Sequence, residues 1–162
     1  MPRGILELEL KKIVLTDQDK DDLMLGVSHL LDISFKVRQN GFYYIEDEIK
    51  NLDDEFLKLA YRLVADGYEL ESSRHILCNF IDSSHTSDID YVRMCMQLDT
   101  ILMMAEKPVH FVNMALFSYF GLNYRDRYIA KLKELSPNYH LFGIFYILGN
   151  PVELSEDGYG TV

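Results

Sequence analysis

Four side chains of the types that bind zinc follow one another at helical spacing in the middle of the chain. They occupy positions i, i+3, i+7 and i+10 and are His75, Cys78, Asp82 and His85. If one helix continued to His85, all four would lie along one flank of it. However, consecutive serines at 83 and 84 weaken a helix there, and no pair has the spacing of a zinc finger. We therefore predict ordinary histidines and a small buried cysteine, with no metal bound.

A second pattern, Asp17, Asp19 and Asp21, resembles the beginning of a calcium-binding EF-hand loop. That loop requires glycine at its sixth position and a bidentate glutamate at its twelfth, whereas this chain has Asp22 and Ser28. Because acids are favoured at the start of a helix, we predict helix capping instead. The sequence also contains no Gly-x-Ser-x-Gly nucleophile elbow and no glycine-rich phosphate loop. We therefore predict a protein that is not an enzyme and needs no cofactor.

The charge balance argues against nucleic acid as a partner. The 162 residues contain 16 Lys and Arg against 26 Asp and Glu, a net charge of −10, which repels nucleic acid and anionic lipid. The exception is the segment 124–135, where four bases outnumber two acids; these bases are Arg125, Arg127, Lys131 and Lys133. Such a segment could contact nucleic acid or lipid headgroups, but we interpret it as a solvated helix face. Only two cysteines are present, Cys78 and Cys95, which suits a reducing cytoplasm.

We expect neither a secretory signal nor a membrane-spanning helix. Charged residues alternate with the leucines of residues 5–12, unlike the apolar centre of a signal peptide. The longest uncharged stretches, 108–124 and 135–152, contain too many polar residues to supply the ~20 mainly apolar residues of a spanning helix. At this length we predict one helical domain over residues 1–150, followed by a mobile acidic tail over 151–162.

Helical periodicity predicts an all-α fold, a single compact bundle of about six to eight helices. The expected helices cover residues 17–40, 42–52, 54–66, 69–82, 88–107, 109–120 and 124–135. The expected N-caps are Thr16, in a capping box with Asp19, and then Asp53, Ser87 and Asn123. In the fourth helix, Phe80 is expected to face inward. Residues 5–15 could form a short helix, a strand or an extended arm, and residues 139–148 a short helix or strand.

The expected helix 88–107 is apolar nearly all round and contains four of the seven methionines. A helix of this kind is usually central in a bundle, and methionine fills irregular gaps in a core. We interpret the methionines as core residues. The alternative is a methionine-rich groove through which a helical regulatory or adaptor protein, unrelated to motility, would bind its partner.

The stretch from Leu30 to Ile81 carries an ordered set of short motifs. They are Arg38-Gln-Asn-Gly41, Ile45-Glu46-Asp-Glu-Ile49, Phe56-Leu57 and Leu63-Val-Ala-Asp-Gly67. In this order and spacing they resemble the cytoplasmic loop of motility protein A, the stator subunit of the bacterial flagellar motor. The resemblance covers about a third of the chain and includes none of the four membrane spans that the family has.

The resemblance implies an electrostatic docking surface. In the family, an arginine and a glutamate of this loop engage a charged helix of the rotor switch protein, and by position these are Arg38 and Glu46. We therefore expect a non-enzymatic interaction protein that docks on rotor, stator or an associated ring. It would be cytoplasmic, peripheral at the motor, and able to form a homo-oligomer. Arg38 could instead serve only the C-terminus of its own helix, where a cation is favoured by ~0.3–1 kcal/mol. Glu46, near the start of the next helix, has the same alternative.

Overall fold

The first long helix begins where the sequence predicts it. In the computed structural model, which describes residues 10, 12–143, 153–154 and 160–161, helix α2 spans Asp17–Asn40. The hydroxyl of Thr16 accepts a hydrogen bond from the backbone N–H of Asp19 at 3.1 Å, and the Asp19 carboxylate accepts one from the Thr16 N–H at 2.9 Å. This reciprocal capping box satisfies two donors at the helix start. It confirms the predicted capping role of Asp19.

Six further α-helices follow among the described residues, which confirms the all-α bundle of six to eight helices. They are α3 (Tyr43–Asn51), α4 (Glu55–Ala65), α5 (Leu70–Ser83), α6 (Asp88–Met104), α7 (Val109–Phe117) and α8 (Arg125–Leu135). Two short 3₁₀ turns, η1 (Leu122–Tyr124) and η2 (Tyr139–Phe142), flank α8. A two-residue antiparallel pair, β1 (Glu153–Leu154) and β2 (Gly160–Thr161), lies further along the chain.

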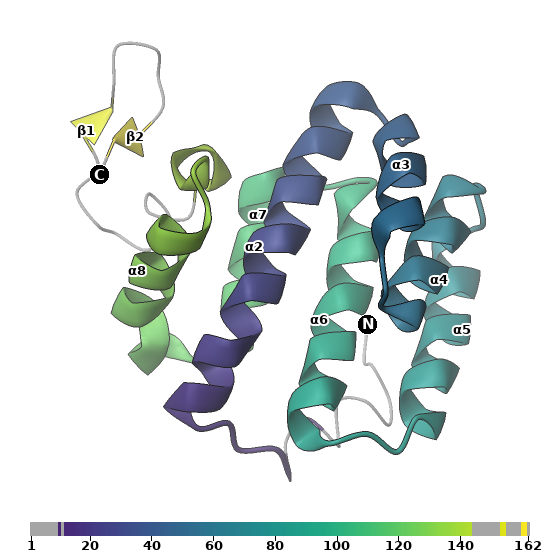
Figure 1. The fold of residues 1–162 in the computed structure, drawn as a ribbon, viewed down its shortest axis with the longest axis horizontal. Coiled ribbons are helices and arrows are strands. Elements are labelled where there is room, and N and C mark those ends of the chain that lie inside the picture. The colour runs from purple at the N-terminus through teal and green to yellow at the C-terminus, as the bar shows by residue number, and fades with distance from the viewer. Residues whose placement is uncertain (1–9, 11, 144–152, 155–159, 162) are drawn as a thin grey trace.

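Helix α6 is the centre of the bundle. It packs against α2, α4, α5 and α7 (Figure 1), and ten of its seventeen residues are buried. Two of its four methionines, Met96 and Met104, are fully buried, and Met94 and Met103 are partly buried. The methionines therefore pack the core, as the sequence analysis favours.

Three of the sequence-based assignments need correction. The N-cap of α4 is Asp54, whose carboxylate accepts from the Leu57 N–H at 3.0 Å, and not Asp53. Helix α8 is preceded by the 3₁₀ turn η1, so that Tyr124 rather than Asn123 stands at its N-cap. Phe80 is exposed on α5, because the buried stripe of that helix runs through Ser73, Leu77 and Ile81.

Two glycines turn the chain at one end of the bundle. Gly41 follows α2 with φ 79°, and Gly67 follows α4 with φ 77°. This left-handed region costs a residue with a β-carbon about 1 kcal/mol or more. The two glycines therefore fix sharp reversals between α2 and α3 and between α4 and α5.

Within the described part of the chain, no helix combines the length and the apolar character needed to cross a bilayer. Most of the segment 5–15, most of the predicted mobile tail over 151–162, and residues 144–148 of the uncertain C-terminal element lie outside the described residues.

Candidate docking surface

The structure places Arg38 and Glu46 on either side of the turn between α2 and α3. Arg38 lies in the last turn of α2, and Glu46 in the first turn of α3. Both side chains are exposed. Gly41 turns the chain between them, so that two opposite charges eight residues apart in sequence lie at one corner of the bundle.

Neither side chain forms an ion pair with another described residue, in contrast to Lys36. Two residues earlier on α2, Lys36 donates hydrogen bonds to Asp32 and to the Tyr44 hydroxyl, each at 2.8 Å. The Asp32 carboxylate, with Tyr44 second, raises the pKa of Lys36 above its ordinary value. The ammonium of Lys36 is therefore engaged by other residues of the chain. The guanidinium of Arg38 forms no such ion pair with a described residue and can meet a partner.

Two other turns lie at the same end of the molecule as the α2–α3 corner. The helices run alternately up and down, and the α2–α3, α4–α5 and α6–α7 connections all lie in the upper part of Figure 1. We call this end the turn end and define its exposed surface by Arg38, Glu46, Arg62 and the aromatic residues described next.

Each of the three connections is followed by an exposed aromatic side chain. Tyr43, Tyr68 and Phe111 are 84%, 55% and 47% exposed, respectively. The ammonium of Lys107 lies 5.6 Å from the centre of the Phe111 ring, a cation–π contact. Because large aromatic side chains are costly to leave in water and are enriched at the centres of protein interfaces, their presence at one end indicates a contact surface.

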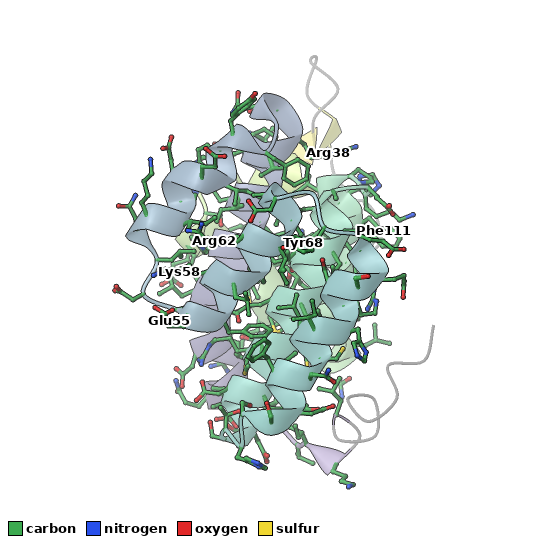
Figure 2. All side chains as sticks on the ribbon, turned by 90° about the vertical axis from the view of Figure 1, so that its right-hand side faces the viewer. Arg38, Glu55, Lys58, Arg62, Tyr68 and Phe111 are labelled. Atoms are coloured by element: carbon green, nitrogen blue, oxygen red, sulfur yellow. The ribbon has the colours of Figure 1, made fainter. Side chains whose placement is uncertain are left out.

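Arg62 adds a second available cation to the turn end. It lies exposed in the last turn of α4 and forms no ion pair with another described residue. In contrast, Lys58 on the same helix pairs with Glu55 at 3.3 Å. Figure 2 shows Arg62, Lys58 and Glu55 in a row down α4, with Arg38, Arg62, Tyr68 and Phe111 all above Glu55.

The aromatic part of this surface was not among the predicted site residues, although each ring follows a helix-terminating residue closely in the sequence. Tyr43 follows Gly41 by two residues, Tyr68 comes directly after Gly67, and Phe111 follows Pro108 by three residues. Residues close to a helix end often lie at the surface of the bundle, although Tyr124, three residues after Gly121, is buried. Sequence position alone therefore marks these three aromatic residues as candidates but does not establish their exposure.

The candidate zinc residues do not share a flank. Helix α5 ends at Ser83, and His85 has a left-handed backbone with φ 50°. The chain therefore leaves the helix before His85, as the two serines suggest. Among the described residues, no group of three or more histidine, cysteine, aspartate or glutamate side chains could hold a metal ion.

Comparisons with protein-family models, with curated proteins and with solved structures find no significant match to this chain.

Proposed function

We propose that the chain is a non-enzymatic docking protein of the bacterial flagellar motor, related to the cytoplasmic loop of the stator subunit. Its partner would be the charged helix of the rotor switch protein. The observation that carries the proposal is the pair Arg38 and Glu46, both exposed and free of ion pairs with other described residues. They occupy the positions that the resemblance assigns to the stator loop's contact residues.

The geometry of the pair suits an oriented electrostatic contact. A cation and an anion on opposite sides of one turn form a small dipole. A partner helix that places an anion opposite Arg38 and a cation opposite Glu46 can pair with both charges in only one orientation. Charges of this kind contribute mainly to the association rate and to specificity. The aromatic side chains Tyr43, Tyr68 and Phe111 would supply the apolar contact area that exposed ion pairs lack.

The same positions also support a local role. Arg38 is the base in the last turn of α2, and Glu46 is an acid in the first turn of α3. The positive charge of Arg38 and the negative charge of Glu46 each interact favourably with the dipole of their own helix. Each interaction stabilises the fold by about 0.3–1 kcal/mol. Local stabilisation and docking are compatible, because an exposed side chain can serve its helix and still meet a partner. A binding measurement separates the two roles.

The proposal is tested first by direct binding between this protein and a purified rotor switch protein. We expect association that weakens as salt rises, because exposed charges are screened over about 8–10 Å near physiological ionic strength. Sedimentation of the chain alone comes before this test, since the turn end could also pair two copies into a homo-oligomer. Absence of association at low salt, with the chain monomeric, would contradict the proposal.

In the cell, we propose a cytoplasmic protein held peripherally at the motor. A fluorescently tagged copy should gather at flagellar bases in cells that have rotor switch protein and disperse in cells that lack it. Uniform fluorescence in both strains would contradict this location.

A further inference from the structure

A groove of about 740 Å³ runs along α2 and is lined by residues of that helix from Asp22 to Lys36. Its lining also includes Asp54 and Leu57 from the start of α4, Arg93 and Gln97 from α6, and residues 135–138 with Phe142. A smaller recess of about 40 Å³ shares five lining residues with the groove. These are Gly26, His29, Leu57, Arg93 and Gln97.

Two buried polar atoms at this recess have no hydrogen-bond partner among the described residues. Gln97 is only 5% exposed. Its Nε2 donates to the Asp54 carboxylate at 2.9 Å, which fixes the amide and leaves Oε1 unpaired. The Nε2 atom of His29 is likewise buried and unpaired. Buried polar atoms are rarely left unpaired, because they lose their hydrogen bonds to water. Both residues line the groove and the recess, so that a small rotation of either side chain would present its buried, unpaired atom to a ligand.

Gly26 on α2 lines both the groove and the recess, and it has no side chain to cover the helix backbone there. A β-carbon added there would meet no atom within 4 Å, so packing does not require glycine at this position. A glycine inside a helix lowers its stability relative to alanine. The missing side chain instead keeps the groove open beside His29.

The lining favours a ligand that donates hydrogen bonds. The two cations of the groove are already engaged, Arg93 with Asp90 and Lys36 with Asp32. The groups of the lining that are not engaged are hydrogen-bond acceptors. They are Gln97 Oε1, and His29 Nε2 when the ring proton is on Nδ1. The carboxylates of Asp22, Asp32 and Asp54 also line the groove. Leu25 and Leu57 provide apolar surface beside these groups.

From these features we infer that the groove binds a small organic ligand that places an amidine or amide N–H group in the recess, against Gln97 and His29, and an apolar body on Leu57. This inference does not rest on the proposed docking function.

Three probes with the same ring and different head groups test the class of ligand. We would titrate the ¹⁵N-labelled full chain with benzamidine, benzamide and benzoate, and follow backbone amide signals and the side-chain amide of Gln97 by NMR. Benzamidine should bind with a dissociation constant of about 1 mM or tighter, and benzamide should shift the same signals. Benzoate should bind at least tenfold more weakly, because its carboxylate donates no hydrogen bond. Failure of both N–H donors to bind, or equal binding by benzoate, would overturn the inference.

Two variants locate the site. Gly26→Leu should fill the groove and weaken benzamidine binding at least tenfold without lowering the melting temperature. Gln97→Met, which removes the amide acceptor at similar length, should weaken benzamidine and benzamide binding by a similar factor. Gln39→Leu adds a leucine to an exposed position of α2 outside the groove and should bind like the parent. Undiminished binding by a folded Gly26→Leu protein would show that the probes bind elsewhere and would also overturn the inference.

Discussion

Arg127 on α8 reaches Asp21 on α2, 106 residues earlier in the chain. Its Nε donates to the Asp21 carboxylate at 2.8 Å, and its Nη2 donates to the other oxygen of the same carboxylate. The hydroxyl of Tyr124 donates to Asp21 at 2.6 Å. This bidentate contact links α8, in the C-terminal part of the bundle, to α2. It also means that the basic segment 124–135 is not entirely a solvated face.

The Asp21 contact predicts a loss of stability in acid. The hydrogen bonds from Arg127 and then Tyr124 hold the pKa of Asp21 below its ordinary value. The carboxylate therefore contributes stability above about pH 4, its unfolded pKa. That stability is lost as pH falls through the folded-state pKa. Urea unfolding of the parent and Asp21→Asn between pH 7 and pH 2 checks this. The difference between the two proteins should shrink as pH falls, and a constant difference would show that the ionised form of Asp21 is not what stabilises the fold.

The N-cap of α4 predicts a loss of stability for Asp54→Ala, and the adjacent residue Asp53 provides the control. Asp54 caps the helix and also accepts a hydrogen bond from Gln97, whereas Asp53 is exposed and caps nothing. Asp54→Ala should lower the free energy of unfolding by about 1–2 kcal/mol, and Asp53→Ala should change it by less than about 0.5 kcal/mol. Chemical denaturation of both variants measures the contrast. A larger loss for Asp53→Ala than for Asp54→Ala would place the cap at Asp53 instead.

The apolar stripes of α4 and α5 predict that truncating their leucines lowers the free energy of unfolding substantially. Leu63 and Leu77 are both buried, so that Leu63→Ala and Leu77→Ala should each cost about 2–5 kcal/mol of unfolding free energy. Leu122, which is exposed, provides the matched control: Leu122→Ala should be close to neutral. Midpoints of denaturation that do not differ among the three variants would mean that these stripes do not form the core.

The fold could be predicted from the sequence because its signals are local. Thr16 with Asp19, Ser87, Gly41 and Gly67 mark helix ends through caps and left-handed turns, which depend on neighbouring residues alone. The errors at Asp53 and Asn123 are shifts of one residue between adjacent candidates for the same cap. Phe80 is exposed, contrary to the prediction, because the buried stripe of α5 is narrow and is completed by a serine, Ser73, rather than by an aromatic residue.

The candidate sites could be predicted only in part, because they depend on tertiary placement. The resemblance to the stator loop singles out Arg38 and Glu46, and the structure leaves both exposed. The groove beside α2 joins residues from α2, α4, α6 and the segment after α8. No local pattern connects Gly26 with Gln97, and only the packing of four elements brings them to one recess.

The aromatic side chains of the turn end should contribute to partner binding. Tyr68→Ser and Phe111→Ser remove exposed rings, so each should weaken binding to the rotor switch protein several-fold while leaving the melting temperature nearly unchanged. Phe80→Ser, an equally exposed ring on α5 away from the three connections, is the control for general loss of surface apolar area. Equal losses for all three variants would point to non-specific hydrophobic contact.

Reversal of both charges at the α2–α3 corner is the most direct test of the proposed function. Arg38→Glu combined with Glu46→Lys leaves the net charge unchanged, as does the control Glu55→Lys with Lys58→Glu on the side of α4. Affinity for the purified rotor switch protein would be measured at low salt beside a thermal melt of each protein. Our account predicts at least a tenfold loss of affinity, about 1.4 kcal/mol, for the corner variant alone, with both variants folded. Unaltered affinity of the folded corner variant would contradict the account and leave Arg38 and Glu46 with only their local roles at the helix ends.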